Sequence, residues 1–243
     1  MFPEICSIGP FTIYSYGLML VIGFVAASGL ACQQAKREHI NPDVIFNLCF
    51  IAFIFGVAGA RIFYVVSNFA YYLRKPLEII MIQQGGLSWF GGLIFGTLAA
   101  VVYIKGKKLS VYKTLDLLIP FVALAQSIGR IGCLLNGCCY GKHAELGLYF
   151  PVHEAILIPT QVYSSLLLIL IYIILRFLQE RPHKAGQIFY TYLFLYAIKR
   201  FFIEFLRADS ARIFLGMTLF QAICAIVFLI SVFSLIRVSK IKQ

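Results

Sequence analysis

The fold is decided by a stretch near the middle of the chain, where the apolar run LDLLIPFVALAQSI (residues 115–128) leads directly into GRIGCLLNGCCYG (residues 129–141). The apolar run predicts a membrane-spanning helix that has Arg130 near its end. Arginine offers a planar, permanently charged fork that suits phosphate or carboxylate, and the glycines allow close approach of the backbone. The alternative interpretation is a solvated arginine at a helix end, followed by a glycine-rich turn.

The composition of the whole chain predicts a membrane protein. Of the 243 residues, 61% are hydrophobic and 13% are charged, whereas soluble domains carry about 25% charged residues. The net charge of +11 is dispersed among hydrophobic spans, so we expect no nucleic-acid partner. Apolar runs of roughly 20 residues predict an all-α integral membrane protein with about seven transmembrane helices, residues 1–243 forming a single polytopic domain. Five of the predicted spans are residues 13–31, 44–66, 159–177, 187–206 and 215–236. The third span in the chain is opened by paired glycines at 85–92 and ends near residue 104, and the fourth ends in the 129–141 stretch.

The distribution of basic residues predicts the orientation of these spans. If the loops alternate between the two sides, one side has twelve basic residues and the other has four: Lys36, Arg37, Lys105, Lys107, Lys108, Lys113, Arg176, Arg181, Lys184, Arg237, Lys240 and Lys242 against Arg74, Lys75, Lys142 and Arg212. Loops rich in Lys and Arg face the cytoplasm. We therefore predict that the amino terminus lies outside, that the carboxyl terminus is cytoplasmic, and that residues 129–141 lie at the outer face.

Several charged residues fall within or at the edge of the apolar runs. Arg61, Arg130 and Arg200 are costly there, at about 2.5 kcal/mol or more for an arginine at the centre of a membrane helix. Arg200 and Glu204 are four residues apart and can pair, and Arg207 falls on the same helix face. One interpretation is that Arg200 and Glu204 form a purely structural ion pair. The other is that the arginines converge on an anionic phospholipid headgroup.

The order and spacing of seven blocks make the chain resemble the bacterial prolipoprotein diacylglyceryl transferases. The blocks are Tyr16-Gly17, Gly59-Ala60-Arg61, Gly85-Gly86 with Gly91-Gly92, residues 129–141, Pro159-Thr160-Gln161 with Tyr163, Arg200 with Glu204 and Arg207, and Gly216 with Thr218 and Gln221. The resemblance implies a multi-pass enzyme of the bacterial inner membrane that uses no cofactor. Such an enzyme transfers the diacylglyceryl group of phosphatidylglycerol to the lipobox cysteine of a prolipoprotein, forming a thioether and releasing glycerol phosphate.

The resemblance also implies the roles of individual residues. Arg130 and Arg200 match catalytic arginines, Glu204 matches the carboxylate that orients Arg200, and Tyr16 matches an essential tyrosine. The residues implied for substrate binding are Arg61, Arg207, Asn136, Gly137, Gly141, Gln161 and Tyr163.

Five positions depart from the pattern of this family. Phe90 and Ile158 replace histidines, Cys133 replaces asparagine, and Cys138 and Ser164 replace glutamates. Phe90 cannot accept a proton, so it cannot act as a general base. The alternative function is therefore a divergent paralogue that binds anionic phospholipid with an altered acceptor or without catalysis.

The cluster Cys133, Cys138 and Cys139 allows several interpretations. The spacing matches no standard zinc pattern, and we expect no metal. A disulfide between Cys133 and one of the other two suits an oxidising outer side. A reactive thiol that replaces lost polar groups or accepts the diacylglyceryl group, and small apolar packing, are the further alternatives. His143 and His153 in the same predicted loop are candidates to replace the missing base.

Overall fold

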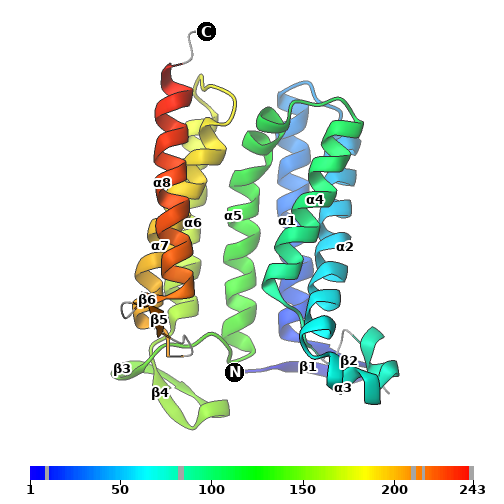
Figure 1. The fold of residues 1–243 in the computed structure, drawn as a ribbon, viewed down its shortest axis with the longest axis vertical. Helices are drawn as coiled ribbons and strands as arrows, with labels where there is room; N and C mark the ends of the chain where they lie inside the picture. The colour runs from blue at the N-terminus through cyan, green and yellow to red at the C-terminus, as the bar shows by residue number, and fades with distance from the viewer. Residues whose placement is uncertain (9–10, 82–84, 209–211, 215–216, 241–243) are drawn as a thin grey trace. The chain divides into compact units, whose positions relative to one another are not determined.

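The computed structural model describes residues 1–8, 11–81, 85–208, 212–214 and 217–240, and its helices account for most of the chain (Figure 1). The long helices are α1 (Ser15–Arg37), α2 (Pro42–Ser67), α4 (Trp89–Gly106), α5 (Val111–Leu135), α6 (Thr160–Gln179), α7 (Gln187–Leu206) and α8 (Leu219–Lys240). Two short helices, α3 (Phe69–Arg74) and η1 (Pro76–Ile80), follow α2. The chain forms two compact units, one of residues Met1–Ala27 with Leu115–Gln243 and one of Ser28–Thr114.

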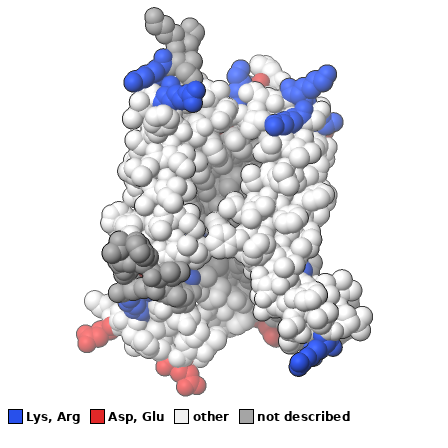
Figure 2. Space-filling model, viewed as in Figure 1, with Lys and Arg blue, Asp and Glu red and all other residues white. Residues whose placement is uncertain are grey.

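Six of the described helices are long and apolar enough to cross a membrane, and α7 is the long helix outside that set. Helix α7 contains Lys199, Arg200 and Glu204 among its 20 residues, and all three are buried. The all-α membrane class is thus confirmed. The count of seven spans, their orientation and the single domain remain predictions. On the face drawn in Figure 2, the sides of the helices lack charged side chains, which gather at the helix ends.

In the described part of the chain, three antiparallel pairs of strands lie outside the helices. They pair β1 (Glu4–Ile8) with β2 (Phe11–Tyr14), β3 (His143–Phe150) with β4 (Ala155–Leu157), and β5 (Arg212–Phe214) with β6 (Met217–Thr218). A 3-10 turn, η3 (Pro151–His153), connects β3 to β4. The predicted seventh span begins at residue 215, and residues 215–216, including Gly216, lie outside the described part of the chain.

In the larger unit, α6, α7 and α8 run side by side (Figure 1). Its core is formed by Ile119 and Ala123 of α5, Ile171 and Leu175 of α6, and Ile188 and Tyr192 of α7. Helix α1 reaches α5 closely, because a Cβ atom on Gly132 would lie only 2.9 Å from the Cβ atom of Met19.

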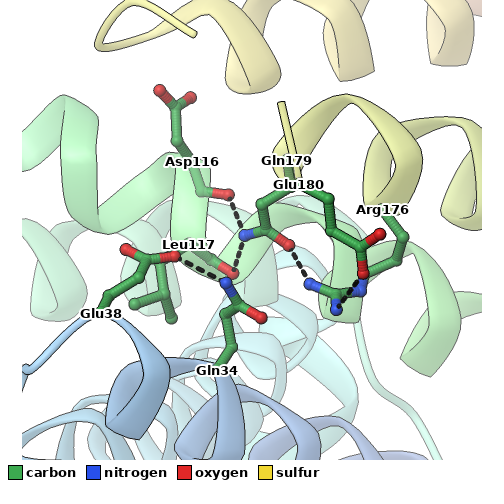
Figure 3. A network of polar contacts seen from close by, with 7 residues as sticks. All are labelled: Gln34, Glu38, Asp116, Leu117, Arg176, Gln179 and Glu180. Carbon is green, nitrogen blue, oxygen red and sulfur yellow. Dashed lines mark hydrogen bonds and ion pairs between the residues drawn. The ribbon is translucent and has the colours of Figure 1, made fainter. Parts of the chain in front are cut away.

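Polar side chains stabilise α5 where Pro120 interrupts its hydrogen bonding. Proline has no N–H group, so the carbonyl of Asp116, four residues earlier, loses its helical donor. Gln179 of α6 donates from Nε2 to that carbonyl at 3.0 Å and to the carbonyl of Leu117 at 3.1 Å (Figure 3). Arg176 in turn donates to Gln179 and Glu180. An unmet carbonyl is expensive in lipid, so this contact keeps the kinked helix compatible with a membrane.

In the smaller unit, α2 and α4 pack through glycines. A Cβ atom on Gly59 of α2 would lie 2.3 Å from Phe95 Cβ of α4. A Cβ atom on Gly91 of α4 would lie 2.3 Å from the Gly59 carbonyl oxygen. Small residues at such a crossing let membrane helices approach closely. Before α4 the backbone is non-helical at residues 85–88, with φ of +84° at Gly85 and +74° at Gly86. Left-handed glycines thus lead into α4, in the span that the paired glycines open.

Candidate functional site

A buried cluster of charged side chains lies near the carboxyl end of α7. Arg200 Nη2 is 2.8 Å from Glu204 Oε2, and Arg207 Nε is 4.0 Å from the same oxygen. Thr218 donates to Glu204 Oε1 at 3.0 Å, and the Arg200 guanidinium lies 4.7 Å from the centre of the Phe220 ring. Glu204 is only 3% exposed. One carboxylate therefore orients two guanidinium groups away from water.

Arg130 of α5 joins this cluster. It interacts electrostatically with Arg207 and Arg200, and both Arg130 and Arg200 interact with Tyr196. Guanidinium groups in such proximity repel one another, and the repulsion is strong where water is scarce. Arg130, Arg200 and Arg207 of the predicted set therefore lie within electrostatic range of one another. Their convergence on an anionic headgroup remains a prediction. An anion among them would relieve the repulsion.

Tyr16 approaches the same region from the start of α1. Its phenol interacts electrostatically with Cys133, Cys138 and Arg130. The contact depends on Gly132, whose Cβ, if present, would lie 3.4 Å from Tyr16 Cα. The sequence-predicted Tyr16 and Arg130 are therefore brought together by the close approach of α1 to α5.

The stretch 129–141 is partly helix and partly turn. Helix α5 continues to Leu135, so Arg130 lies inside the helix rather than after its end. The turn that follows has φ of +72° at Gly137 and +65° at Cys139. Gln161 Nε2 donates to the Cys138 carbonyl at 2.7 Å, and Thr160 Oγ1 donates to the Cys139 carbonyl at 2.6 Å. The first two residues of α6 thereby fix the shape of this turn.

Gly141 connects the turn to the end of α7. It forms a bridge with Arg207, and its N–H donates to the Ile158 carbonyl at 2.9 Å. A Cβ atom at this position would lie 2.7 Å from both Ile158 Cβ and the Leu206 carbonyl oxygen. Only glycine allows this approach, which places the end of the stretch beside Arg207.

The three cysteines of the stretch are close together. The Sγ atoms of Cys133, Cys138 and Cys139 all lie within 4.8 Å of one another, and they are free thiols in this structure. Hydrogen bonds from the Cys133 and Cys138 thiols lower the pKa of Cys139, and the positive charges of Arg207 and Arg130 lower it further. The Cys139 thiol therefore lies within electrostatic range of Arg130 and Arg207.

Arg61 has a different environment, in the smaller unit. Its guanidinium donates to the main-chain carbonyls of Glu78, Ile79, Met81, Gly85 and Gly86, and it stacks over the Tyr72 ring at 5.3 Å. These contacts hold the segment between α3 and α4 in place. Substrate binding by Arg61 remains a prediction.

The remaining predicted binding residues differ in their surroundings. Gln161 is almost fully buried, and its Oε1 has no hydrogen-bond partner. The Asn136 side chain lies within hydrogen-bonding reach of the Cys138 thiol. Tyr163 is 42% exposed on α6, and its role in substrate binding remains a prediction. Gly137 lies in the turn, where its carbonyl contacts His153 Nε2 at 3.0 Å.

The positions that depart from the family pattern supply no obvious base. Phe90 packs its ring against Trp89 at 5.2 Å, Ser164 is buried in α6, and Ile158 forms main-chain bonds to Gly141 and Lys142. Of the two candidate histidines, His153 packs its ring at a tilt against Tyr140, with 4.1 Å between the ring centres, and contacts the turn. His143 lies at the exposed start of β3.

Three residues near the cluster were not assigned a role from sequence. Thr218 belongs to the last of the seven blocks that resemble the family, and this was the only indication in the sequence that it lies near the site. Lys199 precedes Arg200 and is buried, with its Nζ 4.8 Å from the centre of the Tyr196 ring and without a hydrogen-bond partner. Phe220 stacks on Arg200, and nothing in the sequence singles it out.

An apolar cavity of about 250 Å³ lies between α7 and α8. It is lined by Ala197, Ile198, Phe201, Phe202, Cys224, Ala225 and Phe228. Helix α7 lines this cavity with Ala197 and Ile198, just before Arg200, and with Phe201 and Phe202, just after it. The charged cluster and an apolar volume are therefore adjacent on one helix.

The fold and the site together define a class: an all-α membrane protein with buried arginines and one orienting carboxylate near the ends of α5 and α7. The sequence pattern of one family, prolipoprotein diacylglyceryl transferase, matches residues 3–237. The chain belongs to this family.

Relatives from two bacterial genera are similar over most of their length. A phosphatidylglycerol–prolipoprotein diacylglyceryl transferase of Clostridium tetani is 36% identical over 204 residues, which cover 81% of this chain and 82% of the relative. Proteins of the same name from Streptococcus pyogenes serotypes M5 and M1 are each 36% identical over 239 residues, covering 94% of this chain and 92% of the relative.

Proposed function

We propose that the protein transfers a diacylglyceryl group from phosphatidylglycerol to the lipobox cysteine of a prolipoprotein at the bacterial inner membrane. The observation that carries the proposal is the pairing of Arg200 and Arg207 with the buried Glu204, with Arg130 in electrostatic range of both arginines. Family membership and the names of the relatives support the same reaction.

In this proposal the arginines bind the phosphate of the lipid. Guanidinium forks bind phosphate oxygens with two parallel hydrogen bonds. As the bond between the glyceryl carbon and the phosphate oxygen breaks, negative charge grows on the departing glycerol phosphate. Cationic groups already held in position stabilise this charge more in the transition state than in the ground state. Glu204 serves as a positioning residue, because it holds Arg200 and contacts Arg207.

The apolar cavity between α7 and α8 suits an acyl chain of the same lipid. Its lining has no charged side chain, and Cys224 at its edge interacts electrostatically with Arg200. A lipid whose phosphate meets the arginines would then place a tail against Phe201 and Phe228. The acceptor peptide is expected to contact the turn at residues 136–141, whose shape Thr160 and Gln161 fix by hydrogen bonds.

Complementation tests the proposal in cells. The gene is expressed in a bacterium depleted of its own transferase, and the mass of a reporter lipoprotein is measured. The proposal predicts the diacylglyceryl adduct and restored growth with the wild type, and neither with Arg130→Ala at equal expression. Well-expressed wild type without the adduct would favour the alternative, a lipid-binding paralogue without this activity.

A further inference from the structure

The spacing of the three cysteines in the sequence predicts no metal site, but the fold brings their sulfur atoms together as a set of soft ligands that the phosphate-binding role leaves unused. Cys133 lies in the last turn of α5, and Cys138 and Cys139 lie in the turn that follows. Their sulfur atoms all lie within 4.8 Å of one another. Thiolate ligands at this spacing favour zinc, copper(I) or iron–sulfur clusters over hard cations.

The backbone around these thiols is fixed by contacts from elsewhere in the fold. The Cys138 N–H donates to the Cys133 carbonyl at 3.1 Å. Thr160 and Gln161 bind the carbonyls of Cys139 and Cys138, and Cys139 has a left-handed backbone with φ of +65°. The sulfur atoms are therefore held near one another by polar contacts, as a ligand set must be before the metal arrives.

The number of ligands distinguishes a catalytic from a structural site. Zinc–sulfur bonds of about 2.3 Å place two thiolates of a tetrahedral site roughly 3.8 Å apart, so the observed spacing requires a contraction of at most about 1 Å. Among the described residues, no His, Asp or Glu side chain joins the three cysteines. Structural zinc sites use four protein ligands, whereas catalytic sites use three and keep one position open.

We propose that Cys133, Cys138 and Cys139 bind one zinc ion, and that its open fourth position binds the thiol of the acceptor cysteine. The second half of this inference rests on the proposed function. A zinc site gives a role to the cysteines at positions 133 and 138. It would also help the acceptor thiol to lose its proton, which Phe90 cannot accept.

A coordinated thiol loses its proton to water and stays bound as a thiolate. The sulfur lone pair forms a bond to the glyceryl carbon, the carbon–oxygen bond to the phosphate breaks, and its electron pair leaves with glycerol phosphate. The neutral thioether is a poor ligand and dissociates. Arg130 and Arg207 lie close enough to Cys139 to act on it electrostatically, and they offset the negative charge of a zinc ion with three thiolates.

Metal content tests the first half of the inference. The full chain is purified in detergent under reducing conditions from zinc-supplemented cells, and zinc per chain is measured by mass spectrometry. We expect one zinc per wild-type chain. Cys133→Ser, Cys138→Ser and Cys139→Ser should each weaken zinc binding by more than the roughly 10–100-fold that losing an outer-shell partner causes. The exposed Cys6 serves as the matched control, and Cys6→Ser should keep its zinc.

Cobalt substitution tests the second half without turnover. Co²⁺ in a thiolate site absorbs visible light, and we expect its spectrum to change when a lipobox peptide is added, but not when the peptide has serine in place of cysteine. Folded wild type that holds no zinc or cobalt, or a triple serine variant that keeps its zinc, overturns the metal site. An unchanged cobalt spectrum overturns the binding of the acceptor thiol.

The zinc site and the transferase function can fail separately. Wild type that forms the thioether without zinc would overturn the zinc inference and leave the transferase function intact. Wild type that binds zinc but forms no thioether would overturn the transferase function and leave the metal site intact.

Discussion

At the scale of single residues, Glu204 determines where the Arg200 guanidinium lies. Glu204→Gln keeps the shape of the side chain but removes the charge 2.8 Å from Arg200. Breaking a buried pair costs about 3–5 kcal/mol, and a misplaced cationic group costs roughly a hundredfold or more in rate. We expect both losses, in thermal unfolding in detergent and in transfer rate. Glu180→Gln is the control, because Glu180 is 63% exposed in its pair with Arg176, and it should change stability by less than about 1 kcal/mol. Wild-type transfer by Glu204→Gln would contradict the positioning role.

Two glycines of the same stretch provide a matched pair. A Cβ atom at Gly141 would clash with Ile158 and with the Leu206 carbonyl, whereas one at Gly129 meets nothing within 4 Å. Gly141→Ala should destabilise the protein by about 1–3 kcal/mol, as overpacking does, and reduce transfer. Gly129→Ala, inside α5, should be neutral or stabilising by up to about 1 kcal/mol. Equal unfolding temperatures for the two variants would contradict the close approach of the turn to α7.

Some residue contacts could be predicted from sequence and others could not. The pairing of Arg200 with Glu204 follows from helical spacing and is confirmed. Arg207 also reaches Glu204 as predicted, but from the extended residue that follows α7 rather than from the helix face. The carbonyls that surround Arg61 come from a segment about 20 residues away. No periodic pattern predicts such a contact, because the segment is neither a regular helix nor a strand.

At the scale of elements, α7 begins with a cap from another helix. The Asp116 carboxylate of α5 accepts hydrogen bonds from the N–H groups of Gly186 at 2.6 Å and Phe189 at 2.8 Å. Asp116→Ala should lower the free energy of unfolding by about 0.5–2 kcal/mol, the usual loss for such a cap. Asp116→Asn keeps one acceptor oxygen and should fall between alanine and wild type in thermal unfolding. Alanine equal to wild type would show that the cap contributes nothing.

The apolar cavity between α7 and α8 provides a second prediction at this scale. Ala225→Trp fills the cavity lined by Ala225, Phe201 and Phe228. We expect a raised KM for phosphatidylglycerol with little change in unfolding temperature, because Ala225 is exposed. The control is Ile226→Trp on the same helix, at an exposed position outside the cavity lining. If both variants bind the lipid as the wild type does, the acyl chain lies elsewhere.

Hydropathy predicted the long helices well, because a membrane-spanning helix needs apolar side chains along its whole length. Span 187–206 coincides with α7, and 44–66 lies within α2. The β3–β4 hairpin was not predicted, since β4 has only three residues and the eight residues of β3 show no regular alternation of buried and exposed side chains.

At the scale of the whole molecule, the basic loops predict that the amino terminus lies outside. Cys6 is exposed in β1 and reports this directly. A membrane-impermeant maleimide should label intact spheroplasts of the wild type more than those of Cys6→Ser. If the difference appears only after permeabilisation, the amino terminus is cytoplasmic and the predicted orientation is wrong.

The central claim is that buried arginines bind the lipid phosphate and promote transfer to a thiol. The most direct measurement uses purified protein, phosphatidylglycerol vesicles and a lipobox peptide, with the peptide mass as readout. The wild type should add one diacylglyceryl group to the peptide cysteine. Arg200→Ala should reduce the rate by at least about a hundredfold, while Arg181→Ala, in the turn after α6, should match the wild type. Transfer by Arg200→Ala at the wild-type rate would contradict the claim.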